Sequence, residues 1–451
     1  MTARIAGSAL LCVALSGCSA IVDHYSFADV DGGMSPEDAG PLDATVLMDG
    51  GPDAGFDAGH DAGLEVDGGD AGPVDSGPPP PPCESRSSLC GVLDICAGSN
   101  FTCAVLADRG RVVCWGSDTN GQQGRGTPGA AAPVPGEVLE SPGVPLTGID
   151  QVACGTGHVC ARDGAGIFCW GFGGSGQIGN GRADVDNATP AETRDRSGSF
   201  ATAVFAGGRQ SCARMNDGSV WCWGANGFGQ VGSGQTLEDH LLMVEAIQYD
   251  GVTEVGNGDT FMCGRRGGDV ICAGNNFVGN LGNGTNDNSV PVVEVSGVAD
   301  ATRLVTGGGH SCVLRGTDRS VWCWGDNREH QLGRAGTPSS NVPVEVSLPS
   351  GATGVWAGQN HSCARTESGG ILCWGINEEG QLGDATRDTA MTPVEASIDA
   401  AEVVQMALGF DHSCARMRNG SVQCWGRGDD GQLGSGSLTS SLIPVVVAPE
   451  P

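Results

Sequence analysis

The chain reads Gly-Gly-Gly-His-Ser-Cys at 307–312, Ser-Val-Trp-Cys-Trp-Gly-Asp-Asn at 320–327, His-Gln-Leu-Gly at 330–333 and Pro-Val-Glu-Val at 343–346. The same order of motifs recurs along the sequence, and its Cys-Trp-Gly triplet or a close variant begins at Cys114, Cys169, Cys222, Cys272, Cys323, Cys373 and Cys424. A period near 50 residues holds about four short strands, and a single unit of that size cannot bury both faces of its sheet. We therefore expect a closed ring of units.

Local patterns within each copy indicate strands and tight turns. Val321 and Cys323 alternate with Trp322 and Trp324, which is the period of two expected of a strand. Asn-Asp-Gly at 216–218 predicts a hairpin turn. Helical periodicity is sustained nowhere, and 77 glycines with 23 prolines favour many turns. The sequence predicts an all-β chain.

This pattern resembles the repeat of the regulator of chromosome condensation family, whose members form seven-bladed β-propellers. The Gly-Gln-Leu-Gly that follows Trp-Gly-x-Asn, the Gly-x-x-His-Ser turn and the Pro-Val strand carry the resemblance, which spans roughly residues 93–447. The fourth copy departs from it with Cys272-Ala-Gly and Phe261 at the histidine position, and the first has Phe101 there. The resemblance implies seven four-stranded blades of about 50 residues, placed at 93–451 after a connecting segment at 83–92.

The ends of the repeat region suggest how the ring closes. The first copy has no Pro-Val strand before it, whereas the chain finishes with Pro-Val-Val-Val at 444–447 and no hairpin after it. We expect strand 444–447 to pair with the sheet that contains residues 103–115, because this pairing would hide two unpaired edges.

The first 17 residues have the character of an export signal. One arginine, Arg4, precedes an apolar run at 5–15, and Leu-Ser-Gly-Cys at 15–18 resembles the lipobox of bacterial lipoproteins. The apolar run is too short to span a bilayer as a helix, for which about 20 residues are needed. We expect a signal peptide at 1–17 and lipidation of Cys18, with Ser19 permitting sorting to an outer membrane; an ordinary secretory peptide is the alternative.

Residues 18–82 differ in composition from the ring. Residues 19–82 contain 14 acidic residues and no lysine or arginine, Asp-Ala-Gly occurs five times, and five prolines stand at 78–82. Low hydrophobicity and high charge predict a disordered, extended tether. Calcium binding by the spaced aspartates is an alternative, but the order lacks the ligand pattern of a known calcium loop.

Charge argues against a nucleic-acid partner. The net charge is −30, and none of the 23 basic residues is a lysine. Phosphate contacts need a basic patch, so nucleic acid is disfavoured as a partner.

Of the 20 cysteines, 14 form seven pairs that each bracket one predicted hairpin. The two cysteines of a pair face each other across neighbouring strands at a distance that a disulfide can bridge, and export supplies an oxidising compartment. Reduced, buried thiols are the alternative. The predicted pairs are Cys103 with Cys114, Cys160 with Cys169, Cys212 with Cys222, Cys263 with Cys272, Cys312 with Cys323, Cys363 with Cys373 and Cys414 with Cys424.

Four further cysteines remain after Cys12 leaves with the signal peptide and Cys18 is lipidated. Cys83 and Cys90 bracket a short loop and are candidates to pair, and Cys96 and Cys154 occupy corresponding places in the first two copies and are candidates to join them. A zinc site formed by these four is the rival interpretation.

We expect no catalytic site, metal or cofactor. His158, His310, His361 and His412 occupy one repeat position in four copies, and such repetition predicts structural hydrogen bonding of the turn rather than acid–base or metal chemistry. Propeller sialidases would be the enzyme comparison, but the ring holds a single tyrosine, Tyr249, and lacks their Ser-x-Asp-x-Gly-x-x-Trp box.

Positions that vary inside a repeated loop are the candidates for binding. Between Trp-Gly and Gly-Gln-Leu-Gly, the variable pairs grade from apolar in the third and fourth copies to acidic in the sixth and seventh. If these loops share one face, that face is a candidate protein-binding surface, with ordinary solvated loops as the alternative. Its candidate residues are Phe228, Phe277, Arg328, Glu329, Glu378, Glu379, Asp429 and Asp430.

Three functions remain open from the sequence. The first is a non-enzymatic protein-interaction module, a monomeric ring anchored to the bacterial envelope. The resemblance implies the other two, namely inhibition of an exported enzyme such as a β-lactamase and guanine nucleotide exchange on a GTPase. Export argues against nucleotide exchange, and no exchange-specific motif can be matched residue by residue.

Overall fold

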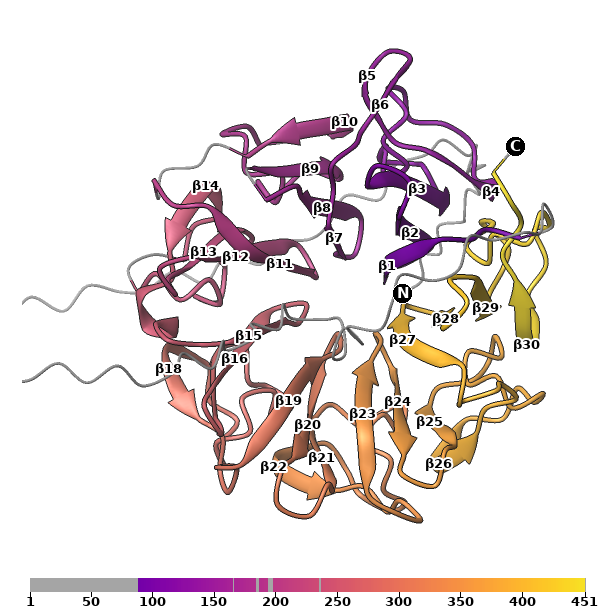
Figure 1. Cartoon of the computed structure of the whole chain (residues 1–451). Coiled ribbons are helices and arrows are strands. Elements are labelled where there is room, and N and C mark those ends of the chain that lie inside the picture. Colours follow the sequence, from indigo (N-terminus) through magenta and orange to yellow (C-terminus); the bar gives the residue numbers. More distant parts are fainter. Residues whose placement is uncertain (1–87, 165, 184–185, 194–197, 235–236, 451) are drawn as a thin grey trace, which may run out of the picture. The chain divides into compact units, whose positions relative to one another are not determined.

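The computed structural model describes residues 88–450 except 165, 184–185, 194–197 and 235–236. Seven antiparallel four-stranded sheets are arranged around a central axis in this part of the chain (Figure 1). Each sheet follows chain order, so that its first strand lies nearest the axis and its fourth lies at the rim. The predicted seven-bladed β-propeller is confirmed.

The first four blades run from Val92 to Glu294. Their strands are β1 (Val92–Ala97), β2 (Phe101–Leu106), β3 (Arg111–Gly116) and β4 (Ala132–Glu137); β7 (Gln151–Cys154), β8 (His158–Arg162), β9 (Ile167–Gly171) and β10 (Asn187–Glu192); β11 (Ala201–Gly207), β12 (Gln210–Met215), β13 (Val220–Gly224) and β14 (His240–Glu245); and β15 (Glu254–Asn257), β16 (Phe261–Arg266), β17 (Asp269–Gly274) and β18 (Ser289–Glu294).

The last three blades run from Ala301 to Val446. Their strands are β19 (Ala301–Thr306), β20 (His310–Arg315), β21 (Val321–Gly325) and β22 (Ser340–Glu345); β23 (Ala352–Ala357), β24 (His361–Thr366), β25 (Ile371–Gly375) and β26 (Ala390–Glu395); and β27 (Val403–Leu408), β28 (His412–Met417), β29 (Val422–Gly426) and β30 (Ser441–Val446). A small hairpin, β5 (Leu139–Ser141) with β6 (Val144–Pro145), joins the first two blades, and η1 (Ile247–Tyr249) is a single 3-10 turn. None of the described residues forms a helix that is long and apolar enough to cross a membrane.

The core lies between the blades rather than within one centre. Each hydrophobic cluster joins residues of two neighbouring sheets, as where Trp324 of the fifth blade packs with Cys263 and Leu281 of the fourth. The tryptophan of each Cys-Trp-Gly triplet is fully buried in such a junction. Burial of a side chain of this size is worth several kcal/mol, so neighbouring blades stabilise one another.

The predicted closing strand pairs differently, and that prediction is wrong. β30 pairs with β29 of its own blade, with Cys424 opposite Val445. The sheet of the first blade is already complete, because β1 supplies its inner strand and β4, with Pro133 and Val134, supplies its outer strand. Every repeat therefore builds a whole blade, and no strand is left over to cross the seam.

Contacts of the last residues close the ring instead. Leu89 N donates to Val447 O at 3.0 Å, and the fully buried Val447 belongs to the cluster of Trp115. Arg111 Nη1 lies 2.9 Å from Glu450 Oε2. Val92 N also donates to Gly420 O at 3.1 Å, so packing, backbone hydrogen bonds and an ion pair contribute to the seam between the seventh and first blades.

Candidate functional site

The four repeated histidines bind the neighbouring blade. Each imidazole Nε2 lies within hydrogen-bond distance of a hydroxyl on the second strand of the next blade: His158 to Ser211 at 2.7 Å, His310 to Ser362 at 2.7 Å, His361 to Ser413 at 2.8 Å and His412 to Thr102 at 2.9 Å. The histidines hold blades together, whereas the sequence interpretation placed their hydrogen bonds within the turn.

The hydroxyl at this junction fixes the protonation of the ring. Ser413 Oγ donates to Gln381 O at 2.8 Å, and the indole Nε1 of Trp425 donates to the same carbonyl at 2.9 Å. Because the hydroxyl hydrogen is used in this way, His361 Nε2 must carry the hydrogen that it donates to Ser413. Nδ1 is then an unprotonated acceptor, and among the described residues it has no partner in any of the four histidines.

Burial keeps these histidines neutral. It lowers the pKa of His158, His361 and His412 to about 3 and that of His310 to about 4. A neutral imidazole whose hydrogen bond is committed to a scaffold hydroxyl is not available for proton transfer near neutral pH.

The glycine of Gly-x-x-His is required by a close approach. A Cβ on Gly155 would lie 2.2 Å from Cε1 of His158, and one on Gly409 would lie 2.3 Å from Cε1 of His412. The same holds where phenylalanine replaces histidine, since a Cβ on Gly258 would lie 2.2 Å from Cε1 of Phe261. The motif is therefore a packing motif of the inner turn.

The structure brings the paired cysteines together. All seven hairpin pairs are disulfides that join the second and third strands of one blade, with Cα–Cα distances between 4.0 and 4.2 Å. Cys96 and Cys154 form an eighth disulfide that links the first two blades. Cys83 lies outside the described residues, as does Cys18, so lipidation and the pairing of Cys83 with Cys90 stay predictions.

The candidate binding loops share one face of the ring. Each loop follows the third strand and is tied to the inner turn of its own blade, as where Ala225 N donates to Arg209 O and Arg427 N donates to Asp411 O. The repeated Asn and Gln side chains hydrogen-bond within the loop; for example, Asn226 Oδ1 accepts from Val231 N at 3.0 Å. We call this surface, which carries the loops and the inner turns, the loop face.

The variable pairs of the loops point at solvent to different degrees. The backbone N–H of the second member donates to the glutamine side chain, as in Phe228 to Gln230 at 3.0 Å and Asp430 to Gln432 at 3.0 Å. In the third to seventh blades the first member is exposed and the second is half-buried. Side chains at these positions therefore vary without loss of the loop geometry.

An aromatic pair forms the apolar end of the loop face. The rings of Phe228 and Phe277, from the third and fourth blades, meet edge to face with centroids 6.3 Å apart. Phe277 is 66% exposed. Exposed aromatic groups of this kind are the usual anchors of protein interfaces.

Acidic groups form the other end. Glu379 pairs with Arg387 at 3.4 Å, and Asp429 pairs with Arg427 at 3.5 Å. Asp411 lies beneath them, and burial, with Glu379 and Glu378 acting in the same direction, raises its pKa to about 6 although Arg427 opposes this. Arg328 folds back onto Asp326 at 2.6 Å, so its charge is compensated within its own blade.

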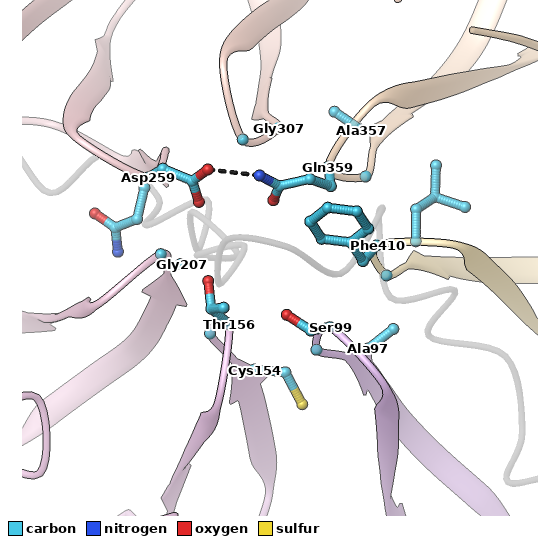
Figure 2. Close-up of a pocket in the computed structure, with 18 of the residues that line it drawn as sticks. Ala97, Ser99, Cys154, Thr156, Gly207, Asp259, Gly307, Ala357, Gln359 and Phe410 are labelled. Atoms are coloured by element: carbon cyan, nitrogen blue, oxygen red, sulfur yellow. Dashed lines mark hydrogen bonds between the residues drawn. The ribbon is translucent and has the colours of Figure 1, made fainter. Parts of the chain in front are cut away.

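The axial mouth is a part of the loop face that sequence reasoning missed. A cavity of about 90 Å³ opens there, and Figure 2 shows it lined by the inner turns of the blades. The residue after the repeated glycine lines it in each blade: Ser99, Thr156, Gly208, Asp259, Gly308, Gln359 and Phe410. Variation inside a fixed turn was the signal that could have identified this set.

One hydrogen bond crosses the mouth. Gln359 Nε2 donates to Asp259 Oδ2 at 2.5 Å, as Figure 2 shows. Burial raises the pKa of Asp259, while Gln359 and Arg209 act to lower it. Within the described residues, no group of three or more His, Cys, Asp or Glu side chains is arranged to hold a metal ion.

These features define a class of protein: a seven-bladed propeller of repeats near 50 residues, pinned by a disulfide in every blade and carrying variable loops on one face. Two family models for the regulator of chromosome condensation (RCC1) repeat match the chain, one at residues 92–122, 201–230, 302–331, 355–381 and 403–432 and the other at 109–162, 318–365 and 419–451. The chain belongs to the RCC1 repeat family.

Relatives in this family differ widely in length. The ultraviolet-B receptor UVR8 of Arabidopsis thaliana is 28% identical over 366 residues, which are 79% of this chain and 81% of the receptor. The human E3 ubiquitin-protein ligase HERC2 is 29% identical over 351 residues, which are 75% of this chain but 7% of the ligase.

Solved structures share the fold at lower identity. Human WBSCR16 superposes with a TM-score of 0.65 at 20% identity, covering 75% of this chain and 94% of that one. Yeast RCC1 (Prp20), in its complex with Kap60, gives 0.64 at 18% identity, with 81% and 88% covered. These similarities establish the propeller fold. Because one fold can carry many functions, the function depends on the surface residues of this chain.

Proposed function

We propose that this protein is a non-enzymatic protein-binding module that presents its loop face to a partner outside the cytosol. The observation that carries the proposal is the Phe228–Phe277 pair, with Phe277 exposed and Phe228 half-buried, on a face where the repeated Asn and Gln side chains hydrogen-bond within the loops. A face that carries an aromatic pair together with charged loops has the apolar and polar components of a protein interface.

The rigidity of the scaffold supports this role. The loops stand on blades that each contain a disulfide and that are joined by buried histidine–hydroxyl contacts, so little conformational entropy is lost when the face is covered. The solved complex of yeast RCC1 with Kap60 shows that a propeller of this fold takes a protein partner. The family resemblance also suggests enzyme inhibition and nucleotide exchange. We have found no described residue that favours either function over general protein binding.

The eight disulfides of the described residues indicate an oxidising, extracytoplasmic location. We propose, from the sequence at 1–82, that Cys18 is lipidated and holds the monomeric ring to a bacterial membrane, with the outer membrane as the destination. Labelling of the wild-type protein with a radioactive fatty acid, and loss of the label in Cys18→Ala, is the expected result for this anchor.

Site-specific crosslinking tests the binding proposal. A photo-reactive residue at Phe277 is expected to trap one discrete protein in the native envelope, whereas the same residue at Ile443, another exposed apolar position, on the outer strand β30, is expected to trap none. Alanine at Phe228, Phe277, Glu378 and Asp430 together should abolish the crosslink at a reporter position on the same face. Identical adducts from positions 277 and 443 would contradict the proposal.

A further inference from the structure

One position of the inner strand bridges to the next blade in the first, second, fourth and seventh blades. It lies nine residues before the first cysteine of the hairpin pair. Asp94 Oδ2 accepts from Val152 N at 2.9 Å, and Glu254 Oε2 accepts from Leu304 N at 2.8 Å. The seven residues at this position are Asp94, Gln151, Ala203, Glu254, Arg303, Gly354 and Gln405.

Gly354 leaves the sixth blade without such a bridge. A Cβ at this residue would lie 2.8 Å from Cη2 of Trp356, so the indole covers the place where a side chain would start. A cavity of about 390 Å³ opens between the sixth and seventh blades beside β23 and β27. Residues of the β24–β25 turn, Glu367 and Gly369, line it, so it lies on the face opposite the loop face.

The same glycine deprives Arg365 of an acceptor. In the fourth blade the equivalent arginine, Arg265, binds Glu254 of its own blade at 2.9 Å, and in the seventh Arg416 Nε donates to Gln405 at 3.1 Å. Arg365 donates from Nη1 to Val403 O at 2.9 Å, and among the described residues this is the one hydrogen bond of its guanidinium. A guanidinium has five N–H donors, so most of those of Arg365 are left for a ligand.

The charge of the cavity is opposite to that of the chain. Arg303, Arg365 and Arg418, from three successive blades, line it in a protein with a net charge of −30. Arg303 is paired with Glu254 of the fourth blade at 3.4 Å, so the charge offered to a ligand rests mainly on Arg365. Glu367 is the one carboxylate among the lining residues, and it is paired with Arg319 outside the cavity.

Apolar groups complete the wall. Val355, Trp356 and Val404 line the same cavity, and the buried indole Nε1 of Trp356 has no hydrogen-bond partner among the described residues. A cavity of about 150 Å³ accommodates a benzene ring, so this one has room for a ring together with a charged substituent.

We propose that this cavity binds a small organic carboxylate, with the carboxylate at Arg365 in the place that Glu254 takes on Arg265, and the apolar body against Trp356 and Val404. A planar guanidinium binds a carboxylate through two parallel N–H donors, which gives affinity and orientation together. This site lies on the face opposite the loop face and does not depend on the partner proposed above.

Titration calorimetry with benzoate, benzamide and inorganic sulfate tests the proposal on the full chain. Benzoate is expected to bind at least about tenfold more tightly than its neutral analogue benzamide, and more tightly than sulfate, because charge and apolar surface are both needed. Absence of benzoate binding up to millimolar concentration, equal affinity for benzamide, or equal affinity for sulfate would overturn the assignment.

Variants locate the site. Arg365→Gln and, separately, the exposed Arg418→Gln should each weaken benzoate binding, Arg365→Gln by about tenfold or more, while Arg182→Gln on the second blade, which changes the net charge equally, should not. Arg418→Gln keeps the test valid if Arg365→Gln fails to fold. Unchanged affinity in both cavity variants, or equal loss in Arg182→Gln, would contradict the proposed location.

Discussion

Gln359 of the sixth blade and Asp259 of the fourth are joined by a 2.5 Å hydrogen bond that crosses the axial mouth above the fifth blade. The fifth blade permits the crossing because it has Gly308 there, where a Cβ would lie 2.2 Å from Gln359 Nε2. Three inner turns, 100 residues from first to last, thus act as one unit at the centre of the loop face.

Gln359→Ala should raise the pKa of Asp259 further, because the amide donor stabilises the carboxylate against burial. When folding raises the pKa of an acid, the folded state is favoured at low pH and is disfavoured as the pH rises and the acid ionises. The variant raises this pKa further, so it should lose stability mainly near neutral pH, by about 1–2 kcal/mol. Carbon NMR titration of the Asp259 carboxyl checks the shift, and Thr156→Ala at the same mouth is the control. An unchanged titration of Asp259 would show that the bond is absent in solution.

His361→Gln should reduce the acid sensitivity of the protein. The pKa of His361 is about 3 in the fold and 6.5 as its ordinary value, so the unfolded chain takes up a proton that the folded chain refuses as the pH falls below 6.5. Stability from this residue is therefore complete above pH 6.5 and falls by about 1.4 kcal/mol for each pH unit below it. Gln210 already occupies the equivalent position in the third blade, where Nε2 donates to Phe261 O at 3.0 Å.

Denaturant unfolding at pH 7.5 and pH 5.0 measures this effect. The stability difference between the two pH values should shrink by about 2 kcal/mol in His361→Gln. Ser413→Ala, which removes the hydroxyl partner but keeps the imidazole, should lose stability at both pH values with its pH dependence intact. Equal pH dependence in the wild type and His361→Gln would be inconsistent with a buried, neutral imidazole.

Loss of the disulfide between blades should cost more than loss of one within a blade. The Cys96–Cys154 bridge closes a segment of 58 residues and the Cys312–Cys323 bridge one of 11. Loop-closure entropy assigns them about 4 and about 3 kcal/mol respectively. Unfolding of the two double alanine variants in oxidising buffer compares them, and a larger loss for the hairpin pair would argue against this entropic account.

Removal of residues 447–451 should destabilise the ring at its seam. The deletion removes the buried Val447 from the cluster of Trp115 and the partner of Arg111 at Glu450, and we expect a loss of about 2–3 kcal/mol. Ile443→Ala, at an exposed position of the same strand β30, should have little effect on the midpoint of thermal unfolding. Equal midpoints for the deletion and the intact chain would mean that the seam is held elsewhere.

Sequence reasoning succeeded where the determining contacts are local. Cys212 and Cys222 face each other because a hairpin between adjacent strands sets their register, and the structure has them directly opposite. It failed at the seam because the first and last repeats were each assumed to be incomplete, so that β30 was assigned to the first blade. The structure instead pairs β30 with β29, and β1, at residues 92–97, completes the first blade.

The repeated period, the alternation within strands and the cysteine spacing were enough to determine the propeller, because each blade forms from contacts inside about 50 residues. Which atoms meet between blades was decided by the tertiary structure alone: His361 reaches Ser413, Gln359 reaches Asp259, and Gly354 opens a cavity beside Arg365. The physical reason is that these contacts depend on how whole sheets pack around an axis. The sequence periodicity of a sheet does not determine how it packs against the next one.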